Sequence, residues 1–297
     1  MKKKSLLARF LIWRLKHVND RQFISFLGIL IGITSGLAAV VIKNSVHFIS
    51  SLLQGTSELE YANFLYMVYP AIGISIAVLF IKYVIKRPVR HGIPNVLYSI
   101  SKTNGQINSH NMFSSIVASA FTVGFGGSVG LEGPTVSTGA ALGSNIGRLF
   151  HLNYKQTTLL LACACSGAMA AIFKAPIAAI VFAVEVIMVD LTMWSLVPIL
   201  LASSTAVITS YFFLGMDVLY PFDVKDGFVM NDLPYYIVLG ILTGLLATYF
   251  TKMYMYIHGL FDKIGKEYIK LLVGGLSLGM IIFFFPSLYG EGYQAIN

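Results

Sequence analysis

The chain has 297 residues, of which 56% are hydrophobic and only 11% are charged, and its mean hydropathy is +0.75. These values exclude an ordinary soluble domain. The net charge of +8 gathers near the ends of apolar runs, where anionic lipid headgroups are nearer partners than nucleic acid.

The N-terminal segment, residues 1–21, is basic and amphipathic. Arginines and lysines alternate there with apolar side chains such as Phe10 and Trp13, and the segment is too short and too charged to cross a bilayer. We expect it to lie along the cytoplasmic surface of the membrane. A secretory signal peptide is the alternative, but no cleavage site of small residues precedes the next apolar run.

Seven apolar runs follow, each near the length that an α-helix needs to cross a bilayer. They cover residues 23–42, 64–81, 157–172, 175–189, 193–214, 235–256 and 271–285. The predicted fold class is therefore all-α, that of a polytopic membrane protein. Cys163 and Cys165 lie in a run of small residues, which favours close helix packing in lipid. A metal site there would need further ligands, and the sequence nearby offers none.

The chain also contains an internal repeat. Leu-Gly-Ile-Leu-Ile-Gly at 27–32 returns as Leu-Gly-Ile-Leu-Thr-Gly at 239–244, and each copy starts a long apolar run that ends near a histidine, His47 or His258. So short a match can arise by chance, but both copies are followed by a second apolar run and a glycine-containing turn. Repeats of opposite topology, with broken helices that place ion sites at helix ends, are typical of secondary transporters. The chain then divides into a cytoplasmic segment (1–21), a first transmembrane repeat (22–214), a loop (215–231) and the start of a second repeat (232–297).

Glu132 stands between glycines in the stretch Gly126-Gly-Ser-Val-Gly-Leu-Glu-Gly-Pro-Thr135. Gly130 and Gly133 let the backbone approach an ion closely, and Pro134 suits the first turn of a helix that continues to about residue 150. The start of a helix attracts anions, and a carboxylate there can occupy the anion site when ionised and leave it when protonated. Glu132 is therefore a candidate gate of an anion pathway. The alternative is a glycine-rich turn whose glutamate only caps the helix.

A second broken helix is expected after His91-Gly-Ile-Pro-Asn95. It is short, from Pro94 to about Ser101. Its first amides would point at the same anion as those near Glu132.

Three motifs in this order resemble the CLC family of chloride channels and chloride-proton antiporters. His91-Gly-Ile-Pro94 is similar to the family's first anion-binding loop, often written GSGIP or GHGVP, and Gly130-Leu-Glu-Gly-Pro134 is similar to its G-K/R-E-G-P loop. Residues 171–185 are similar to the family pattern AAxFNAPLxGxLFxxE. The resemblance implies a CLC-type inverted-repeat fold with broken helices. The second repeat is expected to be incomplete, because the family's GxFxP-type loop and a later ion-contacting tyrosine do not follow.

The resemblance assigns roles only where positions match. Glu132 would be the gating glutamate, and the anion-binding positions would be His91, Gly92, Ile93, Pro94, Gly130, Leu131, Gly133 and Pro134. His91 replaces a serine that contacts the ion in many members; a helix-capping histidine that never meets the ion is the alternative. Leu131 replaces a lysine or arginine, which removes a positive charge beside the pathway.

Lys174 and Glu185 are possible accessory residues of the pathway. Lys174 replaces the usual asparagine of the family pattern and is expected at a membrane interface, with attraction of anions as the alternative. Glu185 is a candidate because a carboxylate at lipid depth is costly unless it is paired or wetted. Val186 stands where proton-coupled exchangers often carry an internal glutamate, which favours channel-like conduction and leaves the exchanger as the alternative.

The sequence thus predicts a multi-pass protein of a bacterial plasma (inner) membrane, with its N-terminus in the cytoplasm, that transports chloride or a similar anion. We expect no cofactor, no metal and no enzymatic activity, because hydrolase and metalloprotease motifs do not occur. The resemblance implies a homodimer for a full-length protein. A membrane fragment that packs against other helices without transporting is the remaining alternative.

Overall fold

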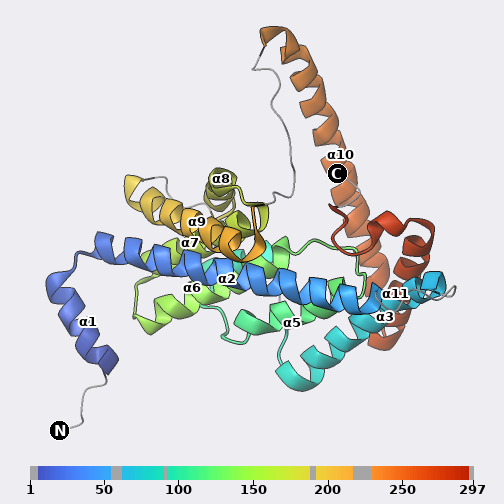
Figure 1. Ribbon diagram of the computed structural model, residues 1–297, viewed down its shortest axis with the longest axis horizontal. Coiled ribbons are helices and arrows are strands. Elements are labelled where there is room, and N and C mark those ends of the chain that lie inside the picture. Colours follow the sequence, from blue (N-terminus) through green and yellow to red (C-terminus); the bar gives the residue numbers. More distant parts are fainter. Residues whose placement is uncertain (1–5, 55–61, 90–91, 188–191, 217–228, 294–297) are drawn as a thin grey trace.

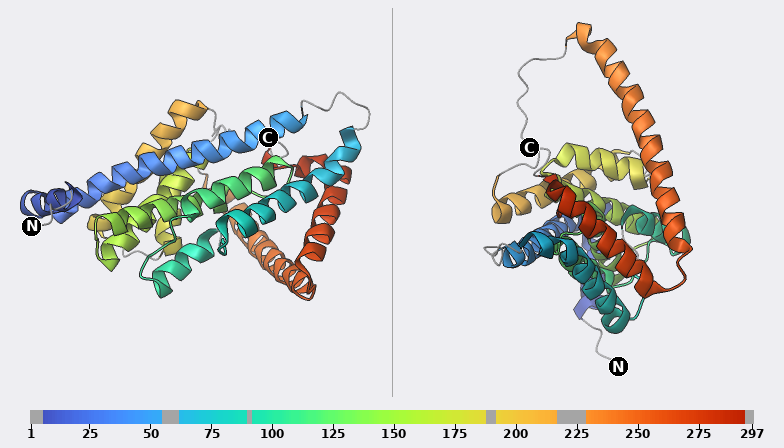
Figure 2. Two further views of the ribbon diagram at one scale, coloured as in Figure 1. Left: turned by 90° about the horizontal axis from the view of Figure 1, so that it is seen from below. Right: turned by 90° about the vertical axis from the view of Figure 1, so that its right-hand side faces the viewer.

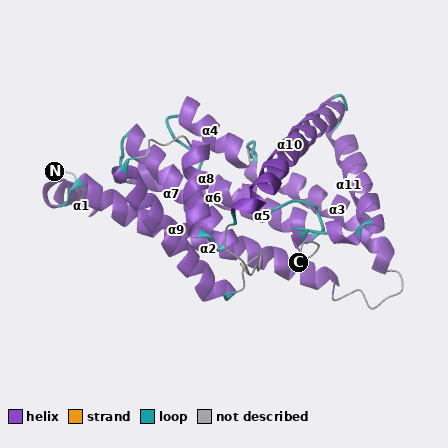
Figure 3. Cartoon of the chain, turned by 90° about the horizontal axis from the view of Figure 1, so that it is seen from above, coloured by secondary structure: helices purple, strands orange, loops and turns teal. Residues whose placement is uncertain are grey.

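The computed structural model describes the chain except for residues 1–5, 55–61, 90–91, 188–191, 217–228 and 294–297. In this part of the chain all regular elements are helices (Figure 3), which confirms the predicted all-α class. The elements are α1 (Leu6–His17), α2 (Asp20–Gln54), α3 (Ala62–Leu79) with a π-helical continuation (Phe80–Ile85), α4 (Gly92–Lys102), α5 (Asn111–Gly124), α6 (Glu132–Leu149), α7 (Tyr154–Phe173), α8 (Pro176–Ile187), α9 (Met193–Leu214), α10 (Leu233–Asp262) and α11 (Glu267–Phe284), with short 3-10 turns at Met230–Asp232 and Pro286–Leu288.

Six helices of the described chain are long and apolar enough to cross a membrane. They match six of the seven predicted runs: Asp20–Leu53, Leu65–Ile85, Tyr154–Phe173, Trp194–Leu214, Met230–Asp262 and Glu267–Phe284. The run 175–189 differs, because α8 has only 12 residues and so reaches about 18 Å, too little to cross the hydrocarbon core. The structure also contains the short apolar helix α5, which was not predicted from the sequence.

Helix α7 lies at the centre of the packed part of the molecule, surrounded by α2, α6, α8 and α9 (Figure 1). Small residues make this packing close, as predicted. A methyl group on Gly139 or Gly143 of α6 would lie 2.9 or 2.7 Å from a backbone carbonyl oxygen of α7. Cys163 and Cys165 are fully buried in α7 and form no disulfide.

Helices α3 and α11, which follow the two copies of the repeated sequence, pack against each other in opposite directions. At one end the Nζ atom of Lys82 lies 3.8 Å from Oε2 of Glu267, and at the other the rings of Tyr66 and Tyr289 are 5.3 Å apart. Between them Gly279 meets Met67 so closely that a side chain at this glycine would overlap the Met67 carbonyl oxygen. Corresponding helices thus run antiparallel, as an inverted repeat requires.

Two helices extend from the bundle (Figures 1 and 2). Helix α1 is joined to α2 through Arg14, which forms an ion pair with Asp20 and lies 4.2 Å from the ring centroid of Phe23. Helix α10 stands apart, and none of its residues is buried by the described chain. A helix that is apolar on all sides is suited to contact with lipid or with other apolar helices.

Candidate functional site

The candidate site is built around the start of α6. This helix begins at Glu132, slightly earlier than predicted, and Pro134 falls in its first turn, where the lack of an N–H is tolerated. Thr135 closes the turn, because its hydroxyl and its N–H both donate to the carbonyl oxygen of Leu131, at 2.7 and 3.1 Å. The N–H groups of the first residues have no acceptor within the helix and remain available to an anion.

The carboxylate of Glu132 folds back over Gly130. Any side chain at position 130 would overlap Oε2 of Glu132, so glycine is required there for the carboxylate to take this position. Oε1 of Glu132 accepts a hydrogen bond from the hydroxyl of Tyr293. Leu131 is the N-cap residue of α6, and its apolar side chain forms no cap.

The start of α4 meets the start of α6. Gly92 is the first residue of α4 and has φ +73°, a conformation that favours glycine. A methyl group on Gly133 would lie 3.8 Å from Cα of Gly92, which is ordinary van der Waals contact. Two helix N-termini, each carrying a positive partial charge and unpaired N–H groups, therefore converge beside the Glu132 carboxylate.

The other predicted anion-binding residues lie around these two helix starts. Pro94 falls in the first turn of α4, and Ile93 packs against the main hydrophobic core. Leu131 is 3% exposed and packs with Ile42, Val46 and Val123, so its side chain belongs to the core. His91 lies outside the described residues.

A segment that follows α11 covers the loop before α6. The ring of Tyr289 lies against Gly126, which has φ +91°, and its hydroxyl is 3.4 Å from the carbonyl oxygen of Gly124. The N–H of Gly290 lies 3.5 Å from the carbonyl oxygen of Gly126. The sequence predicts only a glycine-containing turn here, after the second apolar run of the repeat, and gives its tyrosines no role. Their position in the repeat was the signal that could have found them.

Glu291 adds a second carboxylate to this region, beyond the end of the apolar span of α11. Burial raises the pKa of Glu291, the Lys43 ammonium opposes this rise, and the negative charge of Glu132 adds to it. Glu291 is thus close enough to Glu132 for their charges to interact, although sequence analysis gave it no role.

The two accessory candidates lie elsewhere. Lys174 ends α7 with φ 54° and is only 8% exposed. Its Nζ atom donates to the carbonyl oxygen of Gly215 at 2.7 Å and lies 5.5 Å from the Tyr211 ring centroid. Lys174 is therefore enclosed by protein at the end of α9. Glu185 is exposed on α8, and no contact of either residue with Glu132 is found among the described residues.

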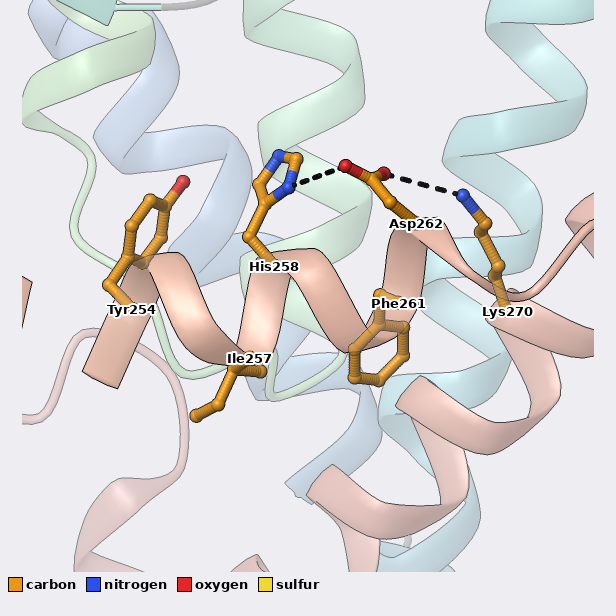
Figure 4. A pocket seen from close by; sticks show the side chains of 6 residues that line it. All are labelled: Tyr254, Ile257, His258, Phe261, Asp262 and Lys270. Atoms are coloured by element: carbon orange, nitrogen blue, oxygen red, sulfur yellow. Dashed lines mark ion pairs between the residues drawn. The ribbon is translucent and has the colours of Figure 1, made fainter. Parts of the chain in front are cut away.

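A separate pocket of about 340 Å³ lies at the turn between α10 and α11, next to the first residues of α11 (Figure 4). Oδ2 of Asp262 lies 3.0 Å from Nδ1 of His258, and its Oδ1 lies 3.6 Å from Nζ of Lys270. These side chains are between 36% and 63% exposed, so they form a solvated ion-pair cluster. Within the described ranges no group of three or more His, Cys, Asp or Glu residues could hold a metal ion.

Comparison with known proteins agrees with this architecture. Residues 72–297 match the family model described as voltage gated chloride channel. The chain is 27% identical over 288 residues to the H(+)/Cl(-) exchange transporter ClcA of Vibrio cholerae, an alignment that covers 91% of this chain and 61% of that protein. It is 27% identical over 296 residues to ClcA of Vibrio vulnificus, covering 95% of this chain and 63% of that protein. The chain spans 61–66% of the length of the first curated relatives that it matches.

Solved structures show the same fold at low sequence identity. A slow cyanobacterial Cl-/H+ antiporter superposes with a TM-score of 0.79 at 18% identity, over 94% of this chain and 67% of that chain. A CLC-type fluoride/proton antiporter superposes with a TM-score of 0.74 at 22% identity, over 98% of this chain and 68% of that chain.

Proposed function

This chain belongs to the voltage-gated chloride channel family, and we propose that it transports chloride or a similar anion across a membrane, with Glu132 as the gate. The observation that carries the proposal is the meeting of α4 and α6 at Gly92 and Gly133, beside the Glu132 carboxylate. An anion that leaves water needs several convergent donors, because burial of an unpaired charge is expensive. Two helix starts can supply such donors from the backbone alone.

In this proposal the residues around the gate have distinct roles. Gly92 and Gly133 let the two helix starts approach each other closely. Ile93 contributes a backbone amide, and Pro94 and Pro134 start the helices without an N–H of their own. Gly130 makes room for the gating carboxylate, and the amide of Leu131 lies beside it. His91 would offer a ring N–H to the ion.

The charge distribution supports a cytoplasmic position for the turn between α10 and α11. Lys82, Lys86 and Arg87 follow the end of α3, and the ion pair of Lys82 with Glu267 brings them next to Lys263 and Lys266 in that turn. Basic residues gather on the cytoplasmic side of membrane proteins. Glu132 and the segment 289–293 then lie toward the opposite side, and the basic residues of α1 favour a cytoplasmic N-terminus.

The family resemblance also supports pairing of two copies through α8 and α9. Ile177 on α8 and Phe212 on α9 are 77% and 82% exposed, and such apolar side chains are available to a second copy or to lipid. Cross-linking of single cysteines introduced at these positions, in vesicles, tests the pairing. Absence of cross-linked dimer at both positions would count against it.

The test of the proposed function is anion efflux from vesicles that contain the purified full chain. Glu132→Gln removes the negative charge while keeping the shape of the side chain, so efflux is expected to become independent of pH. Glu267→Gln, at a carboxylate that is 83% exposed, is the matched control and should keep the pH dependence of the parent. Efflux in Glu132→Gln that still rises with acid as in the parent would exclude this gate. No efflux from the parent would favour the non-transporting alternative.

Proton-coupled exchange is the second candidate, and the names of the Vibrio relatives favour it. Val186 favours uncoupled conduction, because a valine side chain cannot pass a proton. A proton gradient imposed on vesicles with equal chloride on both sides separates the two mechanisms. Net chloride movement under that gradient, with the membrane potential clamped, identifies an exchanger.

A further inference from the structure

The gate has a partner from the other repeat. The hydroxyl of Tyr293 donates a hydrogen bond to Oε1 of Glu132, across a separation of 161 residues in the chain. Glu132 opens α6 in the first repeat, whereas Tyr293 follows α11 in the second. A bond from a phenol to an ionised carboxylate is charge-assisted and stronger than one between neutral groups.

The segment that carries Tyr293 is anchored next to the gate. The ring of Tyr289 packs edge-on against the ring of Tyr66, with centroids 5.3 Å apart. The same ring lies so close to Gly126 that a side chain at position 126 would overlap it. Gly290 and Gly292 have φ +72° and +74°, which turns the chain between the two tyrosines. The fold therefore holds the Tyr289 side of this turn next to the loop before α6.

We propose that Tyr293 is a positioning residue that holds the Glu132 carboxylate over Gly130, so that the gate opens only when this hydrogen bond breaks. The inference rests on the proposed function. A protonated carboxyl group loses the charge that strengthens the bond, so acid releases the gate from Tyr293. Because the two residues belong to different repeats, a shift of the segment 289–293 relative to α6 releases the gate as well.

In the part of the chain that the structure describes, few other charged groups lie near Glu132. Glu291 belongs to the same segment as Tyr293. The charge of Lys43 on α2 lowers the pKa of Glu291, and the charge of Glu132 raises it. His91, which precedes Gly92 in the sequence, lies outside the described residues. The remaining helices that pack against α6 carry His110 and Lys174. His110 precedes the first residue of α5, at the opposite end of that helix from Gly124. Lys174 follows α7 and donates a hydrogen bond to the carbonyl oxygen of Gly215.

The test compares two tyrosines of the full chain, reconstituted in vesicles loaded with chloride. Tyr293→Phe removes the bond to Glu132 and is expected to raise efflux at pH 7.5 by about tenfold, the factor that corresponds to one hydrogen bond to a charged group. Half-maximal efflux should also be reached at a higher pH than in the parent, because one restraint on the gate has been removed. Tyr235→Phe, the matched control, removes the hydroxyl of a side chain on α10 that is 76% exposed and should leave both quantities unchanged.

A second variant disrupts the contact between Glu132 and Tyr293 by displacing the carboxylate instead of removing the hydroxyl. Gly130→Ala places a methyl group where Oε2 of Glu132 lies and displaces the carboxylate from Tyr293, so the same rise in efflux at pH 7.5 is expected. In the Glu132→Gln background Tyr293→Phe should have no further effect. If Glu132→Gln abolishes pH dependence but neither Tyr293→Phe nor Gly130→Ala raises efflux, the positioning role is wrong and the gate stands. If Glu132→Gln leaves pH dependence intact, the proposed function fails first.

Discussion

Gly32 of α2 and Ala202 of α9 touch backbone to backbone, so closely that any side chain on Gly32 would overlap the Ala202 carbonyl oxygen. Gly28, one turn earlier, has the same relationship with Pro198, where a methyl group would lie 2.7 Å from the carbonyl oxygen. The first copy of the repeated sequence is thus a packing surface of small residues at a spacing of four, as in other membrane helix pairs. In the second copy, Gly240 and Gly244 have no atom of the described chain within 4 Å of such a methyl group.

The contrast between the two copies gives the first prediction. Gly32→Ala should lower the free energy of unfolding by about 1–3 kcal/mol, because the methyl group forces α2 away from α9. Gly244→Ala, the matched change in the second copy, should not lower the free energy of unfolding. Thermal unfolding of the purified variants in detergent measures both. Equal losses at the two positions would show that another helix covers the face of α10 as closely as α9 covers α2.

The second prediction concerns Glu291 and pH. Burial raises the pKa of this carboxyl group above its ordinary value of 4.5, so the folded state holds the proton more tightly than the unfolded state. The resulting stabilisation is present below pH 4.5 and is lost as pH rises through the raised pKa. Glu291→Gln stays neutral at every pH and should unfold at a higher temperature than the parent at pH 8, with little difference at pH 4. Glu267→Gln is the exposed control, and an equal gain there at pH 8 would contradict the role of burial.

Much of this architecture was predictable because its signals are local. Runs of apolar residues gave six spans, and the glycine and proline pattern around Glu132 gave the start of α6 to within a few residues. The contact of Tyr293 with Glu132 was not predictable, because it joins two repeats and depends on how the segment 289–293 packs. Lys174 shows the same limit: its hydrogen bond to the carbonyl oxygen of Gly215 depends on where α9 ends, which the residue type alone does not predict.

The third prediction concerns the predicted anion contact of His91. If its ring donates to the ion, His91→Ser keeps a donor of different size at that place and should preserve transport while changing the preference among anions. Relative permeabilities of chloride, bromide, nitrate and fluoride in vesicles measure the change. Unchanged ratios would favour the capping role, in which the histidine never meets the ion.

The last prediction separates the fold from the pathway at Gly133. A methyl group there would meet Gly92 at 3.8 Å, an ordinary contact, so Gly133→Ala should fold with an unfolding temperature close to that of the parent. The same methyl group would stand between the two helix starts, where the proposed anion needs the backbone within hydrogen-bond distance. Loss of a single good donor contact there is worth about 1–3 kcal/mol, so anion efflux should fall by roughly tenfold or more. Gly244→Ala is the control for efflux, because a methyl group on this glycine of α10 would have no atom of the described chain within 4 Å. Parent-like efflux in Gly133→Ala, with the fold intact, would mean that the anion does not pass between α4 and α6.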